Sequence, residues 1–224
     1  MLLYIFLFFA NNWIWRVINS NFIVFLLISI ESVIIFLIYF KKVSTKIFIV
    51  FWLIFFMLVF WQIKITVPQS LNLLDNDEQR VQKARLKFYN PSDHYIRVIF
   101  YRLNLVEKLE GDFNTISTRI QRNFFESLDL NVYFFAGHPR ERVWANDFVK
   151  FPFVLIVPFL LGLYRIIFAK KLAFIFYFLF SVIILSLIGH KNILGPFVLF
   201  PLMILTIYLG TESFWEILKK KFLI

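Results

Sequence analysis

Residues 21–40 read NFIVFLLISIESVIIFLIYF, and Lys41 and Lys42 follow directly. This stretch carries one charged side chain, Glu31, and has about the 20 residues that a helix needs to cross the hydrocarbon core of a bilayer. Lysines that follow such a stretch are typical of the cytoplasmic side of a membrane. The segment therefore predicts a membrane-spanning helix with a cytoplasmic C-terminal end.

Three basic clusters define the predicted topology. They are Lys41, Lys42 and Lys46; Arg165, Lys170 and Lys171; and Lys219, Lys220 and Lys221. Each cluster lies at the end of a predicted span, and alternation of the spans places all three on one side of the membrane. We expect a multi-pass protein of a bacterial cytoplasmic membrane, with residues 67–150 external and the C-terminus cytoplasmic.

The predicted fold class is all-α, a polytopic α-helical membrane protein with about five transmembrane helices and a small helical external domain between the second and third. The expected spans cover residues 21–40, 46–65, 147–168, 172–188 and 193–210. The expected parts are an interfacial or partly inserted N-terminal helix (1–19), a transmembrane hairpin (20–66), the external helical domain (67–150), a three-helix transmembrane bundle (151–210) and a basic cytoplasmic tail (211–224). A spanning helix truncated at its start is the alternative for residues 1–19.

Within the external domain the sequence predicts three helices. Asp75 with Glu78, and later Ser92, are typical helix-start residues, and Asn90-Pro91 breaks the chain between them. Gly111 is expected to end the second helix, and residues 113–128 are expected to form the third. Residues 129–137 are predicted to be extended.

The net charge of +10 raises the question of nucleic-acid binding. Residues 67–150 contain 12 Lys and Arg against 11 Asp and Glu, so the positive excess lies mainly in the short clusters at helix ends. Such clusters attract anionic lipid headgroups. Membrane lipids are therefore the predicted partners, and nucleic acid is excluded.

The densest group of chemically active residues is the HPRER stretch, residues 138–142. Arg140 and Arg142 present forked donors that suit a phosphate group, and His138 and Glu141 are the candidate catalytic acid or base. A phosphate-bearing lipid would arrive at this depth. The competing interpretation is that both arginines pair with nearby acids and with headgroups.

Glu31 is the second candidate, because a carboxyl group in the middle of a span is costly unless it is neutral or paired. It predicts either a proton or ion relay, a contact with a partner helix, or a hydrogen bond to Ser181, Ser186 or a backbone carbonyl. No metal site is predicted, because His94, His138 and His190 lack short ligand spacings and a capping role explains the acidic run that begins at Asp75. No cofactor motif is present.

Residues 123–164, NFFESLDLNVYFFAGHPRERVWANDFVKFPFVLIVPFLLGLY, resemble a segment of an uncharacterised multi-pass membrane protein family of uncultivated, small-genome bacteria. Residues 74–89, LDNDEQRVQKARLKFY, are similar to an upstream part of the same family. The resemblance implies a membrane protein and carries no known activity.

Three functions stay open at the level of sequence, and whether the protein is an enzyme stays open with them. The first is envelope or lipid-linked glycan assembly, with the HPRER loop on a lipid-linked phosphate. The second is a structural subunit of a larger membrane complex, such as a respiratory assembly with partner membrane subunits. The third is a transporter component that uses Glu31.

Overall fold

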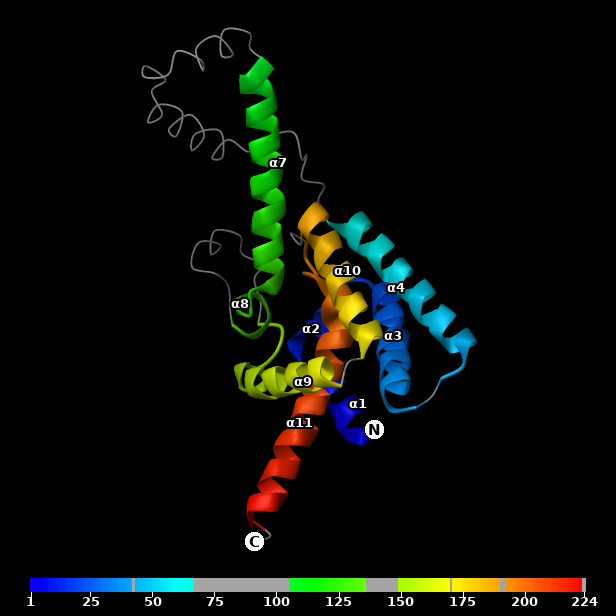
Figure 1. The fold of residues 1–224 in the computed structure, drawn as a ribbon. Helices are drawn as coiled ribbons and strands as arrows, with labels where there is room; N and C mark the ends of the chain where they lie inside the picture. The colour runs from blue at the N-terminus through cyan, green and yellow to red at the C-terminus, as the bar shows by residue number, and fades with distance from the viewer. Residues whose placement is uncertain (42, 67–104, 136–148, 170, 190–191, 223–224) are drawn as a thin grey trace.

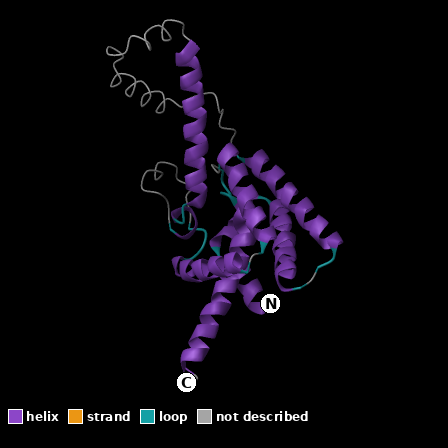
Figure 2. Cartoon of the chain, viewed as in Figure 1, coloured by secondary structure: helices purple, strands orange, loops and turns teal. Residues whose placement is uncertain are grey.

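The computed structural model describes residues 1–41, 43–66, 105–135, 149–169, 171–189 and 192–222, with no account of the side chains of residues 105–115 and 221–222. These residues form helices joined by turns and loops, and no strand occurs among them (Figure 2). The all-α class is therefore confirmed. The expected helices at residues 75–89 and 92–104 lie outside the described residues.

Among the described residues, three helical segments are long and apolar enough to cross a membrane (Figure 1). They are α3 (Phe22–Phe40), α4 (Thr45–Ile65) and Phe197–Lys220, which joins the short 3-10 helix η3 (Phe197–Leu199) to most of α11 (Phe200–Phe222). A fourth is counted if the segment Phe153–Phe168, which contains α9 (Ile156–Phe168), forms one broken span with α10 (Leu172–Ile188); the two segments meet at a bend of 120°. The described residues thus contain three or four candidate spans, which fits a multi-pass membrane protein, and the predicted five are not confirmed.

The predicted third span is shorter than expected. Pro152 precedes the 3-10 helix η2 (Phe153–Leu155), so regular α-helix begins only at Ile156. The 13 residues of α9 extend only about 20 Å, well short of the roughly 30 Å hydrocarbon core. Pro158 falls in the first turn of α9, where proline is tolerated.

The N-terminal segment forms two helices, α1 (Leu2–Phe9) and α2 (Asn12–Ser20). Asn11 separates them and caps both, because its Nδ2 donates to the carbonyl oxygen of Phe8 (2.7 Å) while its Oδ1 accepts from the amide of Ile14 (2.9 Å). Trp13 is fully buried, and its Nε1 donates to the carbonyl oxygen of Leu194. The segment is therefore part of the packed bundle.

The described part of the predicted external domain consists of α7 (Leu105–Leu128) and the short α8 (Asn131–Phe134). Helix α7 packs against α10 and extends well beyond the bundle (Figure 1). Gly111 lies inside α7, so the expected helix end there is wrong. A helical turn at α8 replaces the extended segment predicted within residues 129–135.

Helices α9 and α11 cross at two glycines. A Cβ atom on Gly162 would lie 1.7 Å from the carbonyl oxygen of Thr206, and one on Gly210 would lie 1.6 Å from the carbonyl oxygen of Pro158. Backbones can approach this closely only where neither residue has a side chain. The crossing holds α9 across α11 instead of alongside it (Figure 1).

The predicted basic ends lie on one side of the bundle. The turn between α3 and α4 and the C-terminal end of α11 lie toward the lower part of Figure 1, and α10 runs upward from its break with α9. Helix α11 continues through Gly210 as far as Phe222, so the expected tail at 211–224 begins as an extension of the last span. We call the side of the molecule that carries the basic ends the lower end, and the side of α7 the upper end.

Candidate functional site: a buried carboxyl group in the helix bundle

Glu31 lies at the centre of the bundle. It shares one face of α3 with Val24, Ile28 and Ile35, at helical spacings, and like them it has an exposed fraction of 0%. Neither carboxyl oxygen has a hydrogen-bond partner among the described residues. An acidic group fully enclosed by the protein without a partner is rare, since buried polar groups are normally hydrogen-bonded.

The predicted partners of Glu31 are occupied elsewhere. The Ser181 hydroxyl donates to the carbonyl oxygen of Tyr177 (2.8 Å), and the Ser186 hydroxyl donates to that of Val182 (2.7 Å). Both serines therefore bond within α10, and the predicted hydrogen bond from either to Glu31 is wrong. Serine in a helix commonly bonds back to the preceding turn in this way.

Two buried tyrosines have hydroxyl groups that interact electrostatically with the carboxyl group. The Tyr4 hydroxyl donates to the carbonyl oxygen of Ser32 (2.8 Å), which is the next residue after Glu31. The Tyr177 hydroxyl donates to the carbonyl oxygen of Val198 (2.8 Å). Both hydroxyl groups lie within electrostatic reach of Glu31. Three titratable groups from α1, α3 and α10 thus converge in the interior.

Above this group, Gln62 joins α4 to the irregular start of the last span. Its Nε2 donates to the carbonyl oxygen of Gly195 (3.2 Å), and its Oε1 accepts from the amide of Val198 (3.4 Å). Thr66 and Asn192 extend the network toward the upper end, because Asn192 Nδ2 donates to Thr66 Oγ1 (3.2 Å). The backbone amide of Val198 therefore contacts Gln62, and its carbonyl oxygen contacts Tyr177.

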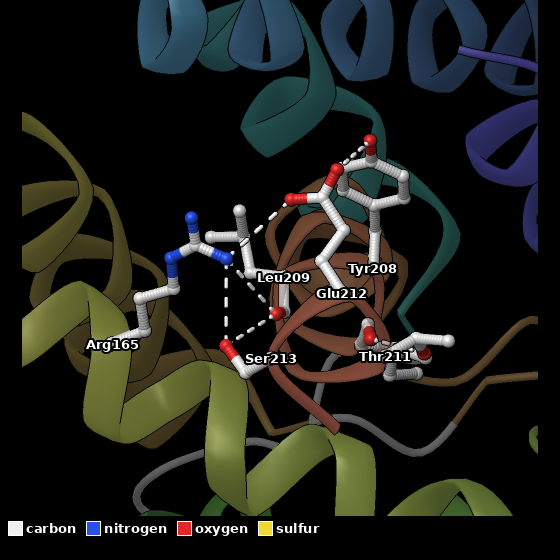
Figure 3. A network of polar contacts seen from close by, with 7 residues as sticks. Arg165, Tyr208, Leu209, Thr211, Glu212 and Ser213 are labelled. Carbon is white, nitrogen blue, oxygen red and sulfur yellow. Dashed lines mark hydrogen bonds and ion pairs between the residues drawn. The ribbon is translucent and has the colours of Figure 1, made fainter. Parts of the chain in front are cut away.

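Below Glu31, a second network links α9 to α11 (Figure 3). Arg165 Nη1 lies 3.4 Å from Glu212 Oε2 and donates to the carbonyl oxygen of Leu209 (3.4 Å) and to Ser213 Oγ (3.4 Å). The Tyr208 hydroxyl donates to the other carboxylate oxygen of Glu212. Because the side chains of Arg165 and Glu212 are 34% and 30% exposed, this network reaches the surface of the lower end.

Aromatic rings join the lower network to the centre. The Tyr4 ring meets the Tyr208 ring edge to face, with 5.5 Å between centroids, and both rings pack on Phe36. Ring contacts thus connect Tyr208, the hydrogen-bond partner of Glu212, to Tyr4, whose hydroxyl lies within electrostatic reach of Glu31.

A buried lysine marks the upper boundary of the bundle. Lys150 Nζ donates to the carbonyl oxygen of Val132 (2.6 Å) and lies 5.8 Å from the centre of the Trp13 ring. Next to it, the Tyr133 hydroxyl donates to the carbonyl oxygen of Ser127 (2.8 Å). Burial raises the pKa of the Tyr133 hydroxyl, and the nearby Asp129 carboxylate raises it further.

The other predicted site residues lie outside the described residues. This holds for the candidate acid or base groups His138 and Glu141 and for the candidate phosphate ligands Arg140 and Arg142. His94, His190 and the acidic run that begins at Asp75 also lie outside the described residues. Within the described ranges, no group of three or more His, Asp or Glu side chains is placed to hold a metal ion.

No protein-family model, no curated protein and no solved structure matches this chain. The resemblance of residues 74–89 and 123–164 to a membrane protein family stays a prediction. The site is therefore interpreted from its own geometry.

Sequence reasoning found Glu31 and missed its surroundings. Gln62 carried a usable signal, because it is a lone amide within the apolar run 47–63. Tyr4 and Tyr177 carried none, since the chain has 9 Tyr and 32 Phe and most of these rings simply pack. The Arg165–Glu212 pair is separated by 47 residues, so only the crossing of α9 and α11 reveals it.

Proposed function

We propose that this chain is a proton-transfer component of a membrane, with Glu31 as the group that takes up and releases the proton. The observation that carries the proposal is the enclosed, unpartnered Glu31 carboxyl group, with the hydroxyl groups of Tyr4 and Tyr177 within electrostatic reach. Ionisable groups at this depth are costly and usually belong to proton relays or ion pathways. A carboxyl group can take up and release a proton by changing between its acid and carboxylate forms.

The complete enclosure of Glu31 favours this role over a contact with a partner helix. A partner could reach the carboxyl group only if part of it were exposed, and its exposed fraction is 0% within this single chain. The role of a structural subunit in a larger complex would therefore have to use other surfaces. Transport of a proton, in contrast, uses a site that lies inside the bundle.

We further propose the orientation that the basic clusters predict. The lower end would be cytoplasmic and the end that carries α7 would be external. The turn between α3 and α4, the start of α10 and the end of α11 lie toward the lower end, and these segments contain the described lysines Lys41, Lys46, Lys171, Lys219 and Lys220. A bacterial cytoplasmic membrane, with its standing proton gradient, is the setting that suits a proton-transfer component.

The lipid-linked glycan hypothesis rests on residues 138–142 and stays a sequence prediction. Its test is separate from the test of Glu31. If the double variant Arg140→Ala/Arg142→Ala binds a polyprenyl phosphate as well as the wild type does, the phosphate role of this loop is excluded.

The proton-transfer proposal is tested in liposomes that contain the purified chain and a pH-sensitive dye. A potassium diffusion potential drives protons inward, and dye quenching reports their entry. We expect the Glu31→Gln variant to lose about a hundredfold in rate, the loss typical of removing a positioned proton acceptor. Glu216→Gln is the matched control, because Glu216 is exposed on α11.

Two results would overturn the proposal. One is a Glu31→Gln variant that conducts protons as fast as the wild type. The other is a wild-type chain that conducts no faster than protein-free liposomes. In either case the buried carboxyl group has a purely structural role in this chain.

A further inference from the structure

We infer that Tyr208 and Glu212 form the passage through which protons move between Glu31 and the lower end. The inference rests on the proposed function, and it adds the route and the side of the membrane from which the site is reached. Of the described titratable groups in contact with the Tyr4 ring or its neighbours, Glu212 is the acid that reaches the surface.

The entrance is Glu212. Its carboxylate is 30% exposed, so it can exchange protons with water at the lower end. Arg165 contacts one oxygen and the Tyr208 hydroxyl donates to the other. An arginine beside a carboxylate holds that carboxylate in a fixed place. Glu212 is thereby aimed at Tyr208.

The next groups are the two tyrosines. Tyr208 follows Glu212 inward along α11, and its ring touches the ring of Tyr4. The Tyr4 hydroxyl lies within electrostatic reach of Glu31 and is bonded to Ser32, the adjacent residue. Between Glu212 and Glu31 the chain thus supplies two hydroxyl groups, each of which can accept one proton and donate another.

The transfer balances as a relay. Glu212 in its acid form gives a proton to the Tyr208 oxygen as Tyr208 gives up its own, which reverses the hydrogen bond between them. No hydrogen bond joins Tyr208 to Tyr4 or Tyr4 to Glu31 among the described residues, so a water molecule carries a proton across each of these two gaps. Each hydroxyl group and both waters end as they began, and one proton has moved from Glu212 to Glu31.

The test is the liposome assay with the Tyr208→Phe variant. Phenylalanine keeps the ring contacts with Tyr4 and Phe36 and removes only the hydroxyl. We expect the proton flux to fall about a hundredfold, as for loss of a positioned proton donor. Tyr164→Phe is the matched control, because the Tyr164 side chain is 61% exposed on α9 and is expected to keep full flux.

A second variant avoids any effect on folding. Ser213→Cys places the only thiol of the chain beside Arg165 and Glu212, and a cationic thiol reagent is added after reconstitution. We expect modification to block the flux at least about tenfold, since a fixed charge beside the proton entrance opposes transfer. Lys220→Cys, which is exposed near the end of α11, is the control and is expected to conduct normally after modification.

The outcomes separate the two proposals. If Glu31→Gln abolishes the flux while Tyr208→Phe and modified Ser213→Cys conduct normally, the passage is elsewhere and the role of Glu31 stands. If Glu31→Gln also conducts normally, both proposals fail. Loss of flux in all three, with both controls intact, is the result that the inference predicts.

Discussion

The Tyr4 hydroxyl group donates a hydrogen bond of 2.8 Å to the carbonyl oxygen of Ser32, across 28 positions of the sequence. This bond fixes the first helix of the chain against the middle of α3, one residue from Glu31. The bond uses only the backbone carbonyl of Ser32, because the Ser32 hydroxyl has no partner among the described residues. The interior around Glu31 therefore contains both hydrogen-bonded and unpaired polar groups.

We expect the Tyr4→Phe variant to be less stable by about 1 kcal/mol, the usual net value of one buried hydrogen bond. The ring contacts with Phe36 and Tyr208 are retained, so no cavity forms. Thermal unfolding in detergent, followed by circular dichroism, measures the change. Tyr39→Phe is a matched control at a partly exposed position of α3, and an equal loss there would contradict the role of the Ser32 bond.

The glycine crossing makes a stronger prediction. Gly162→Ala puts a methyl group where the carbonyl oxygen of Thr206 lies 1.7 Å away, so α9 and α11 must separate. Overpacking of this kind costs about 1–3 kcal/mol. The same unfolding measurement checks it, with Val157→Leu as the control because Val157 is 52% exposed on α9. A Gly162→Ala variant as stable as the control would mean that the helices do not cross there.

Substitution of Trp13 should destabilise the protein more than substitution of Trp15. Trp13→Phe removes the bond to Leu194 and leaves a buried carbonyl group and a cavity, which together cost about 2–4 kcal/mol. Trp15 is 52% exposed, so Trp15→Phe should cost less than about 1 kcal/mol. Tryptophan fluorescence during unfolding in detergent measures both. A reversed order would contradict the packing of α2 inside the bundle.

The chain has no cysteine, which makes the orientation easy to test with single introduced thiols. Thr118→Cys on the exposed side of α7 should react with a membrane-impermeant thiol reagent in intact cells. Ser44→Cys, exposed in the turn between α3 and α4, should react only after lysis. The reverse pattern would place the α7 end in the cytoplasm and overturn the proposed topology.

The sequence was most informative where one segment alone decides the structure. Residues 21–40 and 46–65 could be recognised as candidate spans because length and apolarity suffice. Their ends match those of α3 and α4 to within one residue. Glu31 could be found for the same reason, as a lone charge in an apolar run. These predictions did not depend on which other segments pack against the helix.

The sequence was least informative where two segments must meet. The shape of α9 depends on its crossing with α11 through Gly162 and Gly210, and single glycines in apolar helices predict no particular partner. Burial of Trp13 depends on the turn around Leu194, which is 181 positions away. Nothing in the sequence pattern indicates that the rings of Tyr4 and Tyr208 are in contact.

If Glu31 transfers protons, its carboxyl group must gain and lose a proton inside the folded bundle. Infrared difference spectra of the reconstituted protein, recorded while the pH is stepped, measure this directly. We predict a carbonyl stretch of a protonated carboxylic acid that changes with pH in the wild type and is absent from Glu31→Gln, while Glu216→Gln retains it. If Glu31→Gln and the wild type instead show the same pH-dependent band, Glu31 does not exchange a proton in the folded protein.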